Sequence, residues 1–190
     1  MKKWIWILPV ALVAGITTQL WLNHSSTPTS HAYQLAGKSS ESVELFSPDD
    51  PRIRIVYFGF TRCPDVCPTS LAMLAGALNQ LEEHELDQLR PIFISLDPDR
   101  DDAALAHQYA QYFHPRLEGL SGSLDTTQKL ANQFGVIFQK SQLEGSELEY
   151  TLDHNSYFYL INARGQLLTK VPHALSPAPV LAAIKTTITQ

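Results

Sequence analysis

The chain has 190 residues, of which 44% are hydrophobic, and its formal net charge is −5 at pH 7. The sequence also has no run of basic residues. A nucleic-acid-binding protein needs a basic surface to contact phosphates, so the charge pattern argues against this class of protein. Two cysteines in the whole chain are too few for a disulfide-based scaffold.

The first 23 residues have the composition of a membrane segment. Lys2 and Lys3 precede an uncharged stretch, residues 4–22, with tryptophans near both ends. This length is at the short limit for crossing a bilayer, and tryptophan favours the interface. We predict a single-pass anchor (1–23) in the cell inner membrane, with the rest of the chain on the periplasmic, extracytoplasmic side because the lysines stay in the cytoplasm. A cleaved signal peptide is the alternative, and it also exports the domain.

The segment that follows has a different composition. Residues 24–40 are rich in serine, threonine and histidine and poor in large apolar residues, which predicts a flexible tether. Residues 41–190 remain, about 150 residues, which is enough for one domain with its own hydrophobic core.

Both cysteines lie in one segment, Ile53–Leu71. An apolar run, Ile53–Phe58, predicts a strand buried on both faces that ends at Gly59. Leucines at helical spacing then predict a helix over Val66–Glu83. The cysteines therefore lie where a strand gives way to a helix.

Cys63 and Cys67 are four positions apart. If the helix has begun by Pro64, their sulfurs lie one above the other on the same helix face. The helix N-terminus and the neighbouring Arg62 both favour a thiolate. Two such thiolates can share a soft metal ion or close a disulfide, and an inert structural pair is the alternative.

The rest of the chain predicts further alternating elements. The acidic residues of Asp97–Asp102 are expected to cap a helix rather than to bind calcium, because the glycine and the distal glutamate of a calcium loop are missing. The order of strands and helices predicts an α/β domain with a mixed sheet and helices on both faces. The expected strands are Pro91–Leu96, Leu117–Ser123, Gly135–Phe138, Leu148–Ile161 and Gln166–Leu168, and the expected helices are 103–113, Asp125–Phe134 and Pro177–Ile188.

Three motifs occur together and in order: FGFTRCPDVCPTSL, SLDPDRD and LDHNSYFYLI. In this combination, over about residues 53–188, the chain resembles the Sco (SenC) family of membrane-anchored, copper-binding proteins with a thioredoxin-like fold. The resemblance implies that Cys63, Cys67 and His154 are the copper ligands. It also implies supporting roles for Asp153 and for the group Asp97, Asp99 and Arg100.

The family implies a metallochaperone rather than an enzyme. Relatives deliver copper to the binuclear copper centre of cytochrome c oxidase subunit II, and a separate thiol reductant keeps the cysteines reduced. Two thiolates and one imidazole suit Cu(I) and can also hold Cu(II). The alternative is a thiol-disulfide oxidoreductase, with Cys63 and Cys67 redox-active, that reduces the cysteines of the oxidase subunit or of another exported partner.

Overall fold

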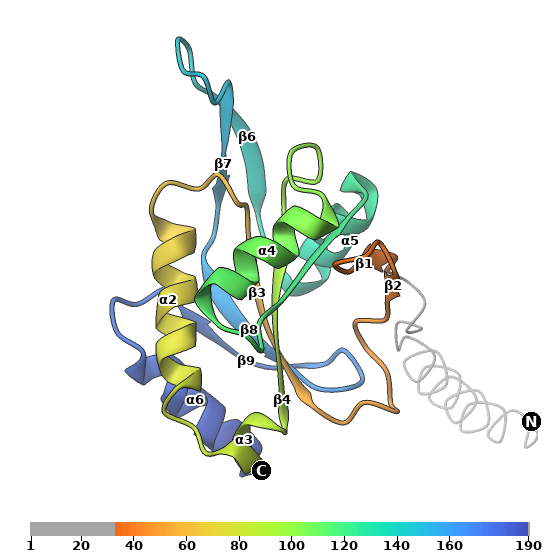
Figure 1. Cartoon of the computed structure of the whole chain (residues 1–190), viewed down its shortest axis with the longest axis vertical. Coiled ribbons are helices and arrows are strands. Elements are labelled where there is room, and N and C mark those ends of the chain that lie inside the picture. Colours follow the sequence, from red (N-terminus) through yellow and green to blue (C-terminus); the bar gives the residue numbers. More distant parts are fainter. Residues whose placement is uncertain (1–32, 190) are drawn as a thin grey trace, which may run out of the picture.

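The computed structural model describes residues 33–189, which form a mixed sheet with helices on both faces (Figure 1). The seven-stranded sheet has the order β2-β1-β5-β4-β3-β8-β9, and β6 and β7 form a separate two-stranded sheet. The strands are β1 (Leu35–Ala36), β2 (Ser42–Val43), β3 (Ile53–Gly59), β4 (Leu89–Ser95), β5 (Glu118–Gly122), β6 (Phe138–Gln142), β7 (Tyr150–His154), β8 (Tyr157–Ile161) and β9 (Leu167–Pro172).

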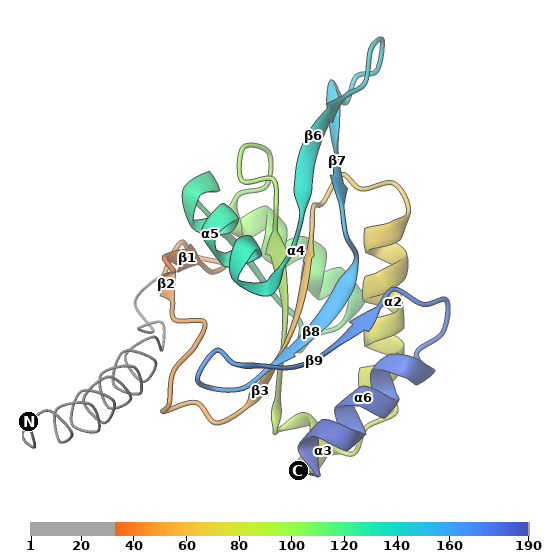
Figure 2. The ribbon, with the colours of Figure 1, turned by 180° about the vertical axis from the view of Figure 1, so that it is seen from behind.

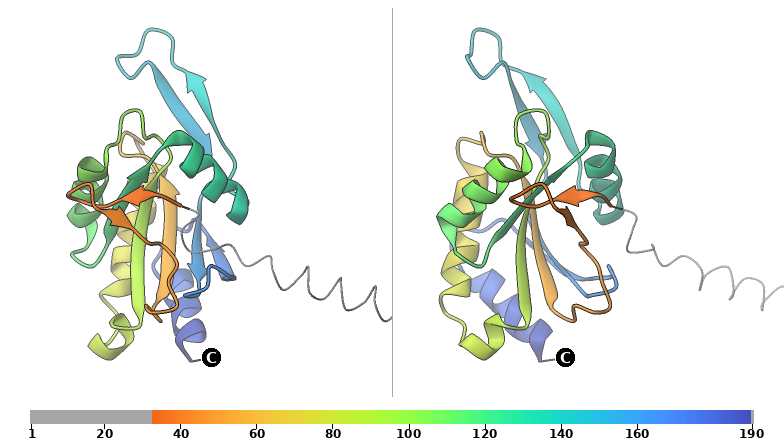
Figure 3. Two further views of the ribbon diagram at one scale, coloured as in Figure 1. Left: turned by 90° about the vertical axis from the view of Figure 1, so that its right-hand side faces the viewer. Right: turned by 45° about the vertical axis from the view of Figure 1, so that its right-hand side comes forward.

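The helices lie on the two sides of the seven-stranded sheet. Seen edge-on, α4 and α5 lie on opposite sides of it (Figure 3, left). Helix α2 contacts both α4 and α6, and α6 also contacts β8 and β9 (Figure 2). The helices are α2 (Val66–Leu78), α3 (Glu83–Leu86), α4 (Ala103–Phe113), α5 (Leu124–Phe134) and α6 (Ala178–Ile188). The predicted mixed α/β architecture is confirmed.

Strand β3 is at the centre of the core. It pairs in parallel with β4 and antiparallel with β8, and the four residues Ile55–Phe58 have at most 1% of their surface exposed. A strand with neighbours on both sides and helices over both faces must be apolar on both faces. The prediction for Ile53–Phe58 is therefore confirmed, and it fixes the direction in which the chain arrives at Cys63.

Two strand predictions were wrong. Gly135 ends α5 in the left-handed conformation (φ 69°), so the strand predicted from Gly135 begins only at Phe138. The single strand expected over Leu148–Ile161 is interrupted at Asn155 and Ser156, and its halves, β7 and β8, belong to different sheets. An apolar, β-branched and aromatic pattern indicates extended chain but does not indicate which sheet each part joins.

The N-terminal boundary also differs from the expected one. Leu35, inside the predicted tether, is 1% exposed and lies in β1, which pairs with β2 and β5. The folded domain therefore begins before residue 41. The predicted anchor, residues 1–23, lies outside the described residues, and within residues 33–189 no helix is both long and apolar enough to cross a membrane.

Candidate metal centre

The three predicted ligands come from three parts of the chain. Cys63 lies in the turn before α2, Cys67 lies in the first turn of α2, and His154 is the last residue of β7. The structure brings His154 to the cysteines: its Nε2 atom is 3.5 Å from the Cys67 Sγ atom, across 87 sequence positions. Both cysteines are free thiols.

Helix α2 begins at Val66, as predicted, but it ends at Leu78 rather than at Glu83, and the condition for stacked sulfurs is not met. Its N-cap residue is Asp65, so Pro64 is not in the first turn and the two sulfurs are not stacked along one helix face. Instead the Cys63 Sγ atom accepts a hydrogen bond from the Cys67 backbone N–H at 3.3 Å. The Asp65 side chain makes no capping bond, so the sulfur satisfies one of the free amides at this helix end.

The two thiols differ in burial and in pKa. Cys67 is fully buried, whereas Cys63 is half-buried. Hydrogen bonds from the Cys67 side chain and from the amides of Cys67 and Asp65, opposed by burial, lower the pKa of Cys63 to about 4. The hydrogen bond to Cys63 and burial raise the pKa of Cys67. The expected easily ionised thiol is therefore Cys63, and hydrogen bonds rather than Arg62 make the largest contributions.

This asymmetry predicts a selective alkylation pattern in the reduced, metal-free chain. Because the pKa of Cys63 is about 4, its thiolate fraction stays nearly constant from about pH 6 to pH 8, and so should its rate with iodoacetamide. Cys67 should remain unreacted over the same range. Replacing Cys67 removes the largest cause of the low pKa, so Cys67→Ala should restore a Cys63 rate that rises with pH. A rate that already rises about tenfold per pH unit in the wild-type chain would contradict the assignment.

The His154 ring has a defined orientation. Its Nδ1 atom is 3.2 Å from the backbone carbonyl oxygen of Asn155, and a carbonyl can only accept, so Nδ1 carries the proton. In the neutral ring with this tautomer, the Nε2 atom is the free acceptor, and it faces Cys67. The rings of Tyr57 and Phe60 lie edge-on to the imidazole, with centroids 6.5 and 6.0 Å away, so aromatic groups shield this side of the site from water.

Gly59 provides the space for the buried thiol. A Cβ atom at this last residue of β3 would lie 2.8 Å from the Cys67 Sγ atom and 3.2 Å from the Phe93 ring. No side chain fits there without moving the sulfur or the ring. The sequence offered no signal for this role beyond a glycine at the end of an apolar run.

Asp101 holds the cysteine turn in place. This carboxylate is fully buried and accepts hydrogen bonds from the backbone N–H of Thr61 (2.8 Å), from the Thr61 hydroxyl and from the Ser95 hydroxyl (2.7 Å). The expected capping of α4 is made by Asp102 alone, which accepts from the Leu105 amide at 2.8 Å. Asp101 instead ties the chain two residues before Cys63 to the end of β4.

A second buried group supports the strand that carries His154. Asp97 is 1% exposed; it pairs with Arg100 and accepts a 2.7 Å hydrogen bond from the Tyr150 hydroxyl. Arg100 donates to the carbonyl oxygens of Leu148 and Tyr150 at 2.9 and 3.0 Å, and its guanidinium lies 3.6 Å from the centre of the Tyr150 ring. The loop after β4 therefore fixes the start of β7, whose other end is His154.

The other two acidic residues implied by the resemblance do not face the cysteines. Asp99 forms a surface ion pair with Lys140 at 2.7 Å. Asp153, next to His154, accepts a hydrogen bond from the Ser141 hydroxyl on β6. Both residues contact β6 of the β6–β7 hairpin, and neither contacts the candidate ligand atoms of Cys63, Cys67 or His154.

Two of the three candidate donors lie at a separation that a metal ion can bridge. Within residues 33–189 no group of three or more His, Cys, Asp or Glu side chains is already arranged as a metal site. The pair Cys67 and His154 nevertheless has a suitable spacing. With bonds of about 2.3 Å to sulfur and about 2.0 Å to nitrogen, as in zinc sites, a metal keeps these atoms about 3.5 Å apart at a tetrahedral angle and about 3.7 Å apart at a trigonal angle. The observed separation of 3.5 Å is close to both.

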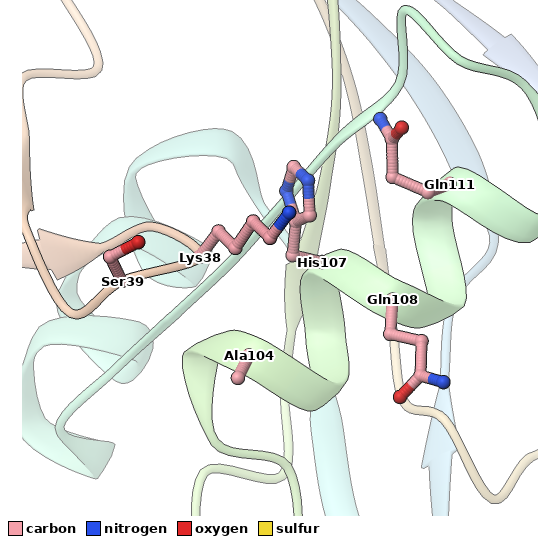
Figure 4. Close-up of a pocket in the computed structure, with 6 residues that line it drawn as sticks. All are labelled: Lys38, Ser39, Ala104, His107, Gln108 and Gln111. Atoms are coloured by element: carbon pink, nitrogen blue, oxygen red, sulfur yellow. The ribbon is translucent and has the colours of Figure 1, made fainter.

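A cavity of about 510 Å³ lies elsewhere, between the β1–β2 turn and α4 (Figure 4). Most of the residues that line it have polar side chains, among them Lys38, His107, Gln108 and Gln111. None of its lining residues belongs to the cysteine–histidine cluster, so this cavity is not part of the candidate metal centre.

Comparison with known proteins identifies the family of the chain. The SCO1/SenC family model matches residues 23–189. An SCO2-like protein of Rickettsia felis is 35% identical over 147 residues, which are 76% of this chain and 71% of the relative. The mitochondrial SCO1 homolog 1 of Arabidopsis thaliana is 41% identical over 108 residues, which are 57% of this chain but only 32% of the relative.

Solved structures agree with these matches. Arabidopsis thaliana ScoI with copper bound has 30% sequence identity and a TM-score of 0.73, over 83% of this chain and 97% of that chain. Bradyrhizobium japonicum ScoI with copper bound has 31% identity and a TM-score of 0.69, over 81% and 96% of the two chains. The thioredoxin-like fold implied by the resemblance is thus confirmed, and the chain belongs to the SCO1/SenC family.

Proposed function

We propose that the protein is a copper carrier that holds one copper ion between Cys63, Cys67 and His154. The observation that carries this proposal is the 3.5 Å separation of the Cys67 Sγ and His154 Nε2 atoms, which the sequence leaves 87 positions apart. Two thiolates and one imidazole form a soft donor set that suits Cu(I) and can also accept Cu(II). Two solved relatives with copper bound support the same chemistry.

The arrangement also supports transfer of the metal to a partner. Cys63 is half-buried, whereas Cys67 is fully buried, so an incoming ligand reaches the metal from the Cys63 side. As each bond from copper to the partner forms, one bond to this chain breaks, and the thiolates left behind bind protons or remain ionised. We propose the binuclear copper centre of cytochrome c oxidase subunit II as the acceptor, as in the family. Because the carrier works only as a dithiol, a separate thiol reductant is required.

The proposal includes a location. The uncharged stretch of residues 4–22 after two lysines supports a single-pass anchor in the inner membrane. The domain then lies on the periplasmic, extracytoplasmic side, where it can meet a membrane-bound oxidase subunit.

Copper binding by the reduced full-length chain tests the proposal. Wild type should bind one equivalent of Cu(I) in competition with a chelator, and Cys63→Ala should lose this binding. His107→Ala, which removes a histidine from the α4 cavity, is the matched control and should bind as wild type does. A wild-type chain that binds no copper, or a Cys63→Ala chain that binds it equally well, would rule the carrier out.

A thiol-disulfide oxidoreductase is the second candidate. The observation in its favour is the unequal burial of the two free thiols, since the half-buried Cys63 sulfur can attack a partner disulfide and the buried Cys67 sulfur can then resolve the mixed disulfide. In this reaction the partner disulfide gains two electrons and Cys63 and Cys67 become a disulfide. Reduction of a model disulfide peptide by the dithiol chain, at the same rate with and without copper, would favour this candidate.

A further inference from the structure

Asn155, the residue after His154, binds the main chain of a neighbouring loop. Its side-chain oxygen accepts a hydrogen bond from the backbone N–H of Ile137 at 3.1 Å, and its side-chain nitrogen donates to the carbonyl oxygen of Gly135 at 3.0 Å. Its own backbone N–H donates to the Ile137 carbonyl at 3.2 Å. Three hydrogen bonds therefore connect Asn155 to the loop between α5 and β6.

The loop that receives these bonds is firmly attached to the body of the domain. Gly135 ends α5 with a left-handed backbone, φ 69°, and the amide of Val136 donates to the Ala131 carbonyl at 2.8 Å. Leu130 and Phe134 of the same helix are buried in the core. The end of α5 is thus a fixed point, whereas the β6–β7 hairpin projects away from the rest of the domain (Figures 1 and 2).

Asn155 also contacts the candidate ligand. Its backbone carbonyl lies 3.2 Å from the Nδ1 atom of His154. The direction of this carbonyl depends on how the backbone of Asn155 is held, and the three bonds to the α5–β6 loop hold it. A hydrogen bond at Nδ1 determines which nitrogen of a metal-binding histidine carries the proton and in which direction the ring points.

We propose that Asn155 is a positioning residue for the metal centre. It locks its own backbone to Gly135 and Ile137, and its carbonyl keeps the proton of His154 on Nδ1 and turns Nε2 towards Cys67. The consequence for copper rests on the proposed function, whereas the consequence for the histidine ring does not. A carboxamide is suited to this task because it offers one acceptor and one donor to a backbone N–H and a backbone C=O.

The test compares Asn155→Ala with Asn162→Ala in the full-length chain. Asn162 is a matched control: its side-chain oxygen accepts from the amides of Arg164 (3.0 Å) and Gln166 (2.9 Å) in the β8–β9 turn. Both variants lose side-chain bonds to loop backbone, but Asn162 has no hydrogen bond to His154. Long-range ¹H–¹⁵N NMR of the reduced, metal-free chain identifies the ring tautomer of His154. Competition with a chelator measures the copper affinity.

Wild type and Asn162→Ala should show a single His154 tautomer with the proton on Nδ1, and Asn155→Ala should show both tautomers. Copper affinity should fall about 10- to 100-fold in Asn155→Ala, the usual effect of losing a partner of a metal ligand, and should stay within about twofold in Asn162→Ala. Asn155→Ala with the wild-type tautomer and with the copper affinity of Asn162→Ala would overturn the proposal.

Two further results separate this proposal from the proposed function. If His154→Ala binds copper as well as wild type does, His154 is not a ligand and the proposed function fails in this respect. The NMR comparison of the His154 tautomer in wild type and Asn155→Ala then remains the test of whether Asn155 positions the ring. If Asn155→Ala does not fold, Asn155→Asp replaces it. This variant keeps the acceptor for Ile137 but has no donor for Gly135, so mixed tautomers are again expected and an unchanged tautomer again overturns the proposal.

Discussion

Replacing His154 with alanine is expected to weaken copper binding by more than about 100-fold while the exchange chemistry of the cysteines persists. Loss of a group that only supports a metal ligand already costs about 10- to 100-fold, and this variant removes a proposed ligand itself. The His154 Nε2 atom lies 3.5 Å from the Cys67 Sγ atom. Among the described residues, no other histidine nitrogen contacts either cysteine sulfur. Cu(II) binding, followed by the sulfur-to-copper absorption band, measures the effect.

The control for this variant is His107→Ala, because His107 lines the α4 cavity and is not part of the candidate metal centre. It should bind copper as wild type does. Reduction of a model disulfide by Cys63 and Cys67 should remain measurable in both variants. Equal copper affinity in His154→Ala and His107→Ala would remove His154 from the ligand set.

Replacing Asp101 with alanine is expected to lower the free energy of unfolding by about 3 kcal/mol or more. The carboxylate is fully buried and accepts bonds from the Thr61 amide, the Thr61 hydroxyl and the Ser95 hydroxyl. Each buried donor left without a partner costs about 1–3 kcal/mol. Because Thr61 lies two residues before Cys63, copper affinity should fall as well. Urea unfolding of the metal-free chain measures the stability.

Asp99→Ala provides the comparison from the same loop. Asp99 forms one exposed ion pair with Lys140, with side chains 56% and 41% exposed, and such pairs contribute about 1 kcal/mol at most. Its loss should leave both the unfolding midpoint and copper binding nearly unchanged. The same unfolding free energy in Asp101→Ala and Asp99→Ala would show that the buried carboxylate does not hold the cysteine turn.

The sequence predicted the centre of the fold well because local pattern and burial agree there. The run Ile53–Phe58 is apolar on both faces, and only a central strand needs that pattern. The helix 103–113 was predicted with its observed bounds, since a capping aspartate, Asp102, stands directly before it. The role of Asp101, the residue before this cap, was predicted less well. An aspartate can cap a helix or bind other donors, and Asp101 binds Thr61 and Ser95 and so supports the cysteine turn.

The candidate metal centre was predictable only in part. The cysteine pair is visible in the sequence as a local motif, but no local pattern can connect Cys67 with His154, which is 87 positions away. The resemblance to a family supplied that connection. The roles of Gly59 and Asn155 depend on which chain segments come to lie beside them, so neither composition nor periodicity could indicate them.

X-ray absorption spectroscopy at the copper edge identifies the ligand atoms in the full-length, reduced chain loaded with one equivalent of Cu(I). We expect two sulfur ligands and one imidazole nitrogen, with the imidazole signal absent in His154→Ala. Copper bound by nitrogen and oxygen alone, or a spectrum that is unchanged in both Cys63→Ala and His154→Ala, would contradict the proposed ligand set.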